Sequence, residues 1–326
     1  MSITRRTLVS LCAGALLASA TATSFAQSDW PSRPVRIISP YGAGGSNDIS
    51  ARIIAAELTR RLGQQFNVEN KPGAGTRLAN EAVARATPDG YTFLFAAAPY
   101  ATAEAMHGKL SYDPGKDLQP LTLSVVAPIF LIVNADSPFK TAQDLIAHGK
   151  TKPQGLTFAS PGSGSGPHLA AELLFREAGV KGLNVHYRGD ATAYTELLAG
   201  RVDATLTAIS SALPHIQSGK LRVLGVASEE RSAVYPQAHT LAEQGWPSVV
   251  GYGWFGFMAP AGTPAPITQR LQTEVNQVVT DPAVKQKLLG MGLEARGTTP
   301  AAFSAFIAAE SRKWGEVIRK ANIKGD

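Results

Sequence analysis

Short apolar runs alternate with segments of helical periodicity along most of this chain. In the first part, the pattern predicts strands at residues 35–39, 66–69 and 91–96, separated by helices at about 47–62 and 77–85. A strand followed by a helix and then by another strand is typical of a parallel sheet with helices packed on it. The alternation therefore indicates an α/β fold.

The same alternation begins again after a break at Asp136-Ser137-Pro138. The second part is predicted to contain helices at about 142–149, 167–178, 191–199 and 212–217, and strands at 156–159, 184–187, 204–206 and 221–227. Two such units agree with the usual domain count for a chain of roughly 300 residues. We therefore predict two α/β lobes, each a mainly parallel sheet flanked by helices.

Three helices are predicted to close the chain, after a strand at about 252–258. Each helix starts with a capping residue followed by proline, at Thr263-Pro264, Asp281-Pro282 and Thr299-Pro300. Three helices and one strand do not easily form a domain of their own. We therefore predict that this tail returns to pack on the first lobe.

This return sets the expected division of the chain. Lobe 1 is predicted to comprise residues 27–134 plus 251–326, and lobe 2 residues 135–250. The chain would then cross between lobes twice, near Asn134 and near Gly251, and the two crossings would act as a hinge.

Residues 1–26 have the pattern of an export signal. Arg5 and Arg6 precede an apolar run at residues 8–20, and a small-x-small sequence ends at Ala26. The run is too short to span a membrane, so we predict cleavage after Ala26 and a periplasmic protein. General secretion is favoured over the twin-arginine route, which stays open. Cys12, the only cysteine, would leave with the signal, and no disulfide is expected.

The net charge of +6 is modest, and the sequence contains no block of Lys and Arg residues. Nucleic acid is therefore not an expected partner.

Two glycine-rich segments lie between a predicted strand and a predicted helix, one in each lobe. The first contains Tyr41, Gly42, Ala43, Gly44, Gly45, Ser46 and Asp48. The second contains Ser160, Gly162, Ser163, Ser165 and His168. A third opening, with Ala74, Gly75 and Thr76, precedes the helix at Arg77.

The start of a helix leaves backbone N–H groups unpaired and carries a partial positive charge, which favours an anion. In open α/β sheets ligands bind beyond the carboxyl ends of strands, where these segments must lie. The sequence therefore predicts a small-anion site between the lobes, held by neutral donors. The alternative is that each segment is only a tight turn. Asp203, which enters a strand, is predicted either to end a turn or to face the ligand.

Catalytic signatures are weak. Ser163 and Ser165 do not fit G-x-S-x-G, and neither a dinucleotide fingerprint nor a phosphate-binding loop occurs. His168 and Glu172 lie one helical turn apart, but a third metal ligand is missing. We therefore predict a binding protein without enzymatic activity, metal or cofactor. A secreted hydrolase that uses a Ser/His pair with His168 stays open as the alternative.

Several motifs occur together in a fixed order. They are Trp30-Pro31-Ser32-Arg33-Pro34-Val35-Arg36, Gly42-Ala43-Gly44-Gly45 with Asp48, Glu69-Asn70-Lys71-Pro72-Gly73-Ala74-Gly75, Pro88-Asp89-Gly90-Tyr91-Thr92, Gly162-Ser163-Gly164-Ser165-Gly166-Pro167-His168 and Ala259-Pro260-Ala261-Gly262-Thr263-Pro264. In this combination the chain resembles the Bug family, the extracytoplasmic substrate-binding receptors of tripartite tricarboxylate transporters. The resemblance covers nearly all of the chain after residue 26.

The resemblance implies a two-lobed, periplasmic-binding-protein-like fold of the Venus flytrap type, which closes on a small carboxylate. Dicarboxylic or tricarboxylic acids, acidic amino acids and aromatic acids are the expected ligands. It adds further ligand-contacting positions to the three segments: Ala97, Pro99, Arg188, Gly189, Asp203 and Thr207. Thr76 and Ala79 replace glycines common in the family, and Tyr41 replaces a common phenylalanine. The implied partners are membrane components of such a transporter, or alternatively a membrane sensor kinase, and the receptor is expected to be a monomer.

Overall fold

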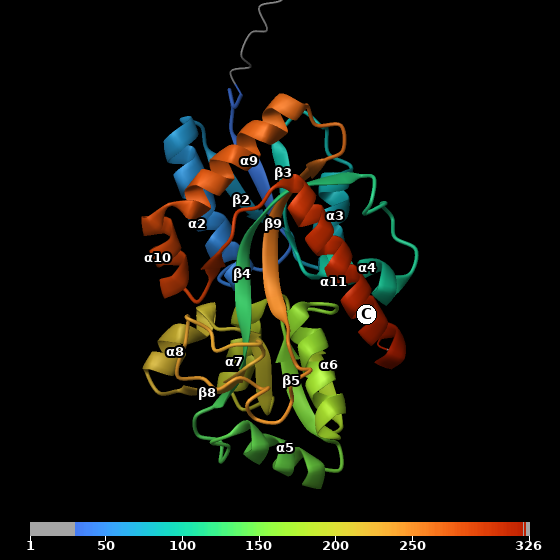
Figure 1. Ribbon diagram of the computed structural model, residues 1–326, viewed down its shortest axis with the longest axis vertical. Coiled ribbons are helices and arrows are strands. Elements are labelled where there is room, and N and C mark those ends of the chain that lie inside the picture. Colours follow the sequence, from blue (N-terminus) through green and yellow to red (C-terminus); the bar gives the residue numbers. More distant parts are fainter. Residues whose placement is uncertain (1–29, 322, 324–326) are drawn as a thin grey trace, which may run out of the picture.

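The computed structural model describes residues 30–321 and 323. The predicted export signal and Cys12 lie outside these residues. The described chain forms two lobes on one continuous sheet, with helices on both faces (Figure 1). Among the described residues, no helix is long and apolar enough to cross a membrane.

Lobe 1 contains the first predicted α/β unit. Its elements are β1 (Val35–Ser39), α2 (Ser46–Leu62), β2 (Phe66–Asn70), η1 (Ala74–Thr76), α3 (Arg77–Ala84), β3 (Thr92–Ala97) and α4 (Pro99–His107). β1 lies between β2 and β3 and pairs with both in parallel, as predicted. The side chains of Ile37, Phe93 and Phe95 are buried in the core against α2.

Lobe 2 repeats this arrangement. Its elements are α5 (Ala142–Thr151), β5 (Leu156–Ser160), α6 (Gly166–Ala178), β6 (Gly182–His186), α7 (Asp190–Leu198), β7 (Ala204–Ala208), η2 (Ser210–Ala212), α8 (Leu213–Gln217) and β8 (Leu221–Val226). β5 pairs in parallel with β6 and β7, again as predicted. β8 departs from the expected direction, because it pairs antiparallel with β4.

One long strand, β4 (Leu118–Asn134), runs through both lobes (Figure 1). From Leu118 to Pro128 it pairs antiparallel with β9 (Tyr252–Pro260), and from Ile129 onward with β7 and β8. The sheet order is therefore β2-β1-β3-β9-β4-β7-β5-β6, with β8 and β10 (Glu294–Ala295) also paired with β4. The strand partners change between Pro128 and Ile129, earlier in the chain than the predicted crossing near Asn134.

The C-terminal tail packs in part against the sheet and core of lobe 1. It comprises α9 (Ala265–Thr280), α10 (Pro282–Gly290), β10 (Glu294–Ala295) and α11 (Pro300–Ala321). Two of the three predicted caps form: Asp281 accepts from Ala283 N and Val284 N, and Thr299 accepts from Ala302 N. Thr263 does not cap, because its hydroxyl donates to Pro260 O.

The last helix contacts more than the predicted lobe. Near its start, Phe303 packs edge-on against Trp254 in lobe 1. Near its end, Trp314 and Ile318 are buried in the core of lobe 2. α11 therefore packs on both lobes, which the prediction of a return to lobe 1 alone did not include.

Candidate ligand-binding site

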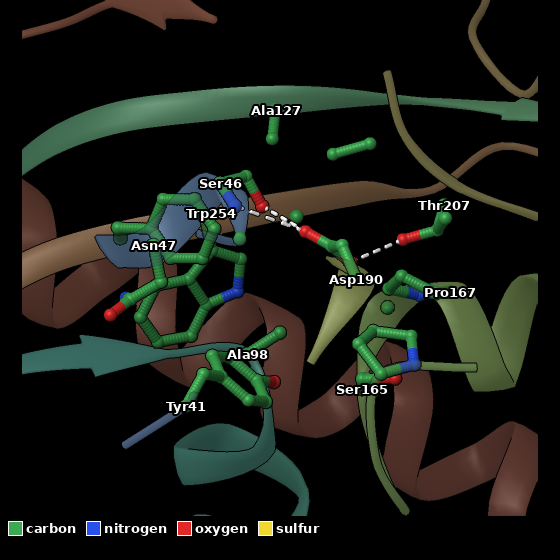
Figure 2. Close-up of a pocket in the computed structure, with 16 residues that line it drawn as sticks. Tyr41, Ser46, Asn47, Ala98, Ala127, Ser165, Pro167, Asp190, Thr207 and Trp254 are labelled. Carbon is green, nitrogen blue, oxygen red and sulfur yellow. Dashed lines mark hydrogen bonds between the residues drawn. The ribbon is translucent and has the colours of Figure 1, made fainter. Parts of the chain in front are cut away.

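Two cavities lie where the lobes meet, beyond the carboxyl ends of the parallel strands. The inner cavity has a volume of about 20 Å³, and the outer one about 230 Å³. The inner cavity is lined by residues of both lobes and of the crossing strands, including Tyr41, Ser46, Ala98, Ser165, Asp190, Thr207 and Trp254 (Figure 2). The outer cavity is lined by Pro40, Tyr41, residues 72–76 and 161–163, and residues 186–188. Tyr41 and Pro161 line both, so the cavities adjoin.

The start of α2 is capped from the opposite lobe. Its own N-cap residue, Gly45, offers no side chain, and Asp190 at the start of α7 takes that role. Asp190 Oδ2 accepts hydrogen bonds from Ser46 N at 3.2 Å and Ser46 Oγ at 2.5 Å (Figure 2). Asp190 Oδ1 accepts from Thr207 Oγ1 at 2.6 Å. A carboxylate here satisfies an unpaired N–H group and meets the positive end of the helix dipole.

Further hydrogen bonds join the two lobes in this closed arrangement. Gly42 N donates to Arg188 O at 2.9 Å, and Thr102 Oγ1 on α4 donates to Gly164 O at 2.8 Å. The backbones approach so closely that a Cβ on Gly42 would lie 2.8 Å from Arg188 O. The absence of a side chain at Gly42 therefore allows the backbones of the two lobes to come into contact.

The second segment, in lobe 2, is built around His168. Ser165 caps α6 by accepting from His168 N, and His168 Nδ1 accepts from Gly164 N at 3.0 Å. The buried His168 ring packs against the His186 ring and lines neither cavity. His168 thus shapes the segment, while Ser163 lines the outer cavity with a buried hydroxyl that has no hydrogen-bond partner.

The protonation of His168 predicts a pH dependence of stability. Burial, and secondarily the charge of His186, lower the pKa of His168 to about 3. An unfolded histidine titrates near pH 6.5, so the unfolded state gains a proton first as the pH falls below that value. We expect this group to cost about 2 kcal/mol of stability by pH 5. Urea unfolding at pH 7 and pH 5 measures the loss, which His168→Asn should reduce while keeping an acceptor for Gly164 N.

The control for this experiment is His148→Asn, which removes an exposed imidazole from α5. Equal losses of stability on acidification in wild type and His168→Asn would contradict the assignment.

The third segment has an uncommon backbone. Ala74 and Thr76 have φ angles of 47° and 76°, in the left-handed region that few residues other than glycine adopt. Such conformations persist where the surroundings enforce them, often at binding sites. Residues 72–76 line the outer cavity, and Arg77 Nε donates to Ala74 O at 2.8 Å. Arg188 also lines the outer cavity.

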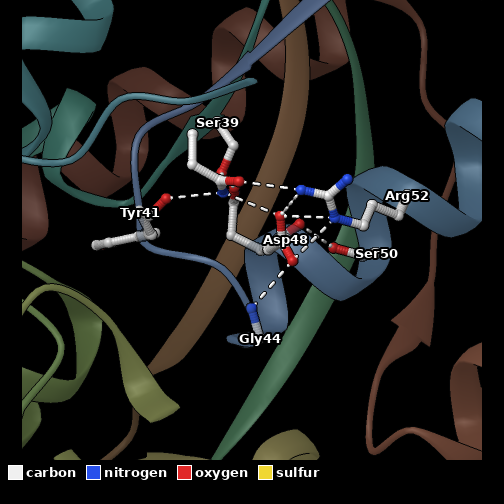
Figure 3. A network of polar contacts seen from close by, with 8 residues as sticks. Ser39, Tyr41, Gly44, Asp48, Ser50 and Arg52 are labelled. Atoms are coloured by element: carbon white, nitrogen blue, oxygen red, sulfur yellow. Dashed lines mark hydrogen bonds and ion pairs between the residues drawn. The ribbon is translucent and has the colours of Figure 1, made fainter. Parts of the chain in front are cut away.

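Asp48 supports the first segment from behind (Figure 3). It accepts from Gly44 N at 3.0 Å and from Asn70 Nδ2 at 2.9 Å, and forms an ion pair with Arg52. Burial acts to raise the pKa of Asp48, but the hydrogen bonds from Arg52, Gly44 and Asn70 outweigh it and hold that pKa below its usual range. Asp48 lines neither cavity, so its charge is used to fix the loop.

Asp203 and Thr207 lie near opposite ends of β7. Asp203 precedes β7 and binds Lys152 Nζ and Thr157 N, outside the lining of both cavities. Thr207, about 13 Å along an extended strand, lines the inner cavity. Of the two alternatives for Asp203, these contacts favour the structural one.

The remaining predicted positions surround the cavities. Ala97 and Pro99 flank Ala98, which lines the inner cavity, and Gly189 links Arg188 to Asp190. Ala43 and Gly44 are exposed at the loop tip. Asp190 itself was not among the predicted residues.

The geometry weighs against the hydrolase alternative. The Ser/His contact in this region joins Ser160 Oγ and His186 Nδ1 at 2.7 Å, and does not involve His168. Ser160 is only 1% exposed in this closed arrangement, so its hydroxyl does not face a substrate cavity here. The described residues also contain no cluster of three or more His, Cys, Asp or Glu side chains that could hold a metal.

Comparisons with known proteins agree with this arrangement. The profile of the TctC family, described as the tripartite tricarboxylate transporter family receptor, matches residues 50–323. Protein BugT of Bordetella pertussis is 34% identical over 90% of this chain and 91% of its own length. A UPF0065 protein from the tcbD-tcbE intergenic region of Pseudomonas sp. (strain P51) is 34% identical, covering 94% of this chain and 92% of that protein.

Solved structures extend the likeness to three dimensions. R. palustris Rpa4515 with adipate has a TM-score of 0.88 at 31% identity, covering 91% of this chain and all of that one. MatC from Rhodopseudomonas palustris with bound malate has a TM-score of 0.83 at 31% identity, covering 89% of this chain and 100% of the other. The resemblance inferred from the sequence motifs is confirmed, and the chain belongs to the tripartite tricarboxylate transporter receptor family.

Proposed function

We propose that this protein is a periplasmic receptor that captures a small carboxylate by closing its two lobes on it. The observation that carries the proposal is the convergence of helix openings from both lobes on two adjoining cavities. α2 and η1 come from lobe 1, and α6 and α7 from lobe 2. Two related proteins of the same fold were solved with adipate and with malate, which supports a carboxylate ligand.

Neutral donors would hold the acid in this site. Ser163 offers a buried hydroxyl without a partner, and the outer cavity is also lined by Gly73, Ala74, Gly75 and Gly162, whose backbone N–H groups are candidate donors. A hydrogen bond to a charged group contributes about 1.5–3 kcal/mol, so a few such donors suffice for tight binding. Arg188, which lines the outer cavity, and Arg77, which follows Thr76 in sequence, are the candidate cations for a second carboxylate.

We further propose that the chain is exported with cleavage after Ala26, binds as a monomer and passes its ligand to the membrane components of a tripartite tricarboxylate transporter. Family membership supports the transporter partner. A membrane sensor kinase stays the alternative partner, since lobe closure would serve both.

A thermal-shift panel on refolded protein tests the carboxylate. Citrate, succinate, malate, adipate and glutamate are compared with glucose and putrescine. A ligand at 100-fold its Kd stabilises the folded state by about 2.7 kcal/mol, which raises the melting temperature. We expect at least one carboxylate to produce this shift, and Ser163→Ala to reduce it by removing a donor from the outer cavity.

The matched control is Ser211→Ala. Ser211 also has a buried hydroxyl without a partner, but it lines neither cavity. Its replacement should leave the shift unchanged. Stabilisation by glucose or putrescine alone would refute the carboxylate ligand, and equal binding by both serine variants would place the site elsewhere.

A further inference from the structure

The inner cavity contains a buried carboxylate without a cationic partner. Asp190 is 5% exposed, and its bonds come from Ser46 and Thr207, which are neutral. No lysine, arginine or histidine of the described chain forms an ion pair with it. Two other aspartates differ, because buried Asp48 pairs with Arg52 and half-buried Asp203 pairs with Lys152.

The remaining lining of the inner cavity does not balance this charge. The polar side chains that line it beside Asp190 are Tyr41, Ser46, Asn47, Ser165, Thr207 and Trp254. All are neutral, and Asp190 is the one ionisable acid among these described residues. Burying a carboxylate costs free energy unless the charge is paired. At Asp190 the hydrogen bonds from two hydroxyls and from the start of α2 offset part of this cost, and a cation in the cavity would offset more.

The same charge acts against a simple dicarboxylate. Two carboxylates that share a cavity repel each other, and both cannot stay ionised without cost. A ligand that fills the inner cavity with a second carboxylate would meet Asp190 directly. A ligand that places a positively charged nitrogen there would instead gain a charge-assisted hydrogen bond.

We propose that Asp190 is a specificity-determining residue that selects ligands with an ammonium group as well as a carboxylate. The carboxylate would lie in the outer cavity, beside Ser163 and residues 72–76. The ammonium would enter the inner cavity and bond to Asp190. Tyr41 and Pro161 line both cavities, so an extended zwitterion that occupies both would pass beside these two residues.

This inference rests on the proposed capture of a carboxylate and narrows it to amino acids of the zwitterionic type. The inner cavity is small in the closed arrangement, at about 20 Å³, which is room for about one water molecule or a group of similar size. An ammonium group is small enough for this volume, whereas a branched or aromatic group is too large.

Matched ligand pairs test the selection. In each pair an ammonium replaces one carboxylate at nearly constant length: β-alanine against succinate, and 4-aminobutyrate against glutarate. Isothermal titration of refolded wild type should show at least tenfold tighter binding of the amino acid in one pair. Asp190→Asn keeps the shape and an acceptor oxygen but removes the charge, so it should reduce that preference at least tenfold.

Asp203→Asn is the control, because it makes the same charge change outside both cavities and should keep the wild-type preference. If the wild-type protein binds the dicarboxylates more tightly than the amino acids, the inference is refuted whatever the variants show. The proposed capture of a carboxylate would still stand. A preference that persists in Asp190→Asn overturns the role of Asp190. Wild type that binds no member of either pair, and no acid of the thermal-shift panel, overturns the proposed function and this inference with it.

Discussion

Replacing Gly42 with alanine is expected to weaken ligand binding by roughly 5- to 150-fold while leaving the fold intact. The added Cβ would lie 2.8 Å from Arg188 O, a backbone atom of the opposite lobe that cannot move aside alone. Overpacking of this kind costs about 1–3 kcal/mol, and here the cost falls on the closed arrangement only. Separation of the lobes removes the close contact, so the population of the open state rises and the affinity for the ligand falls.

Titration with the carboxylate that stabilises wild type most, together with small-angle scattering, measures this effect. Gly290→Ala is the matched control, because it makes the same change at the end of α10, where the added Cβ would meet no atom within 4 Å and which lines neither cavity. We expect Gly290→Ala to bind nearly as wild type and to compact on ligand addition. If Gly42→Ala binds and compacts equally well, the contact between Gly42 and Arg188 does not contribute to closure.

Replacing Trp314 with alanine is expected to lower the free energy of unfolding by about 3–5 kcal/mol, as is typical for a buried tryptophan. Its side chain is 1% exposed and lies in the core of lobe 2 although α11 begins on lobe 1. The ring also packs beside the crossing segment, because a Cβ on Gly251 would meet it at 3.4 Å. The substitution leaves a cavity between helix and lobe that the rigid sheet cannot fill.

Urea unfolding measures this loss, with Arg312→Ala as the control. Arg312 lies two residues away on the exposed face of the same helix, and such substitutions usually change stability by less than about 0.5 kcal/mol. A loss of similar size in both variants would mean that the contact of α11 with lobe 2 contributes little.

The elements that could be predicted from the sequence are those with local signals. β1, β2 and β3 are short apolar runs followed by turn residues, and the helices between them have a clear period. β4 was missed because Pro120 and Pro128 interrupt its run, and proline normally argues against a central strand. The register shifts beside Pro120 and between Leu123 and Val125 accommodate the interruption, and such shifts depend on the partner strand.

The site shows the same division between local and distant information. The three glycine-rich and serine-rich segments were predicted because a strand, a loop and a helix start are contiguous in sequence. Asp190 was missed because an acid at a helix start is a common partner of its own helix dipole. Its bond to Ser46 joins residues 144 positions apart, and no local pattern records that contact.

The continuity of β4 through both lobes also determines which parts of the protein could be exchanged between related receptors. A strand whose first half completes one lobe and whose second half completes the other belongs to both, and α11 has the same dual attachment. Neither lobe can be excised, or grafted onto another receptor, without leaving an open sheet edge and an uncovered core. New ligand preferences in this scaffold are therefore expected to arise by substitutions of single residues that line the cavities, since neither lobe can be inherited as a separate module.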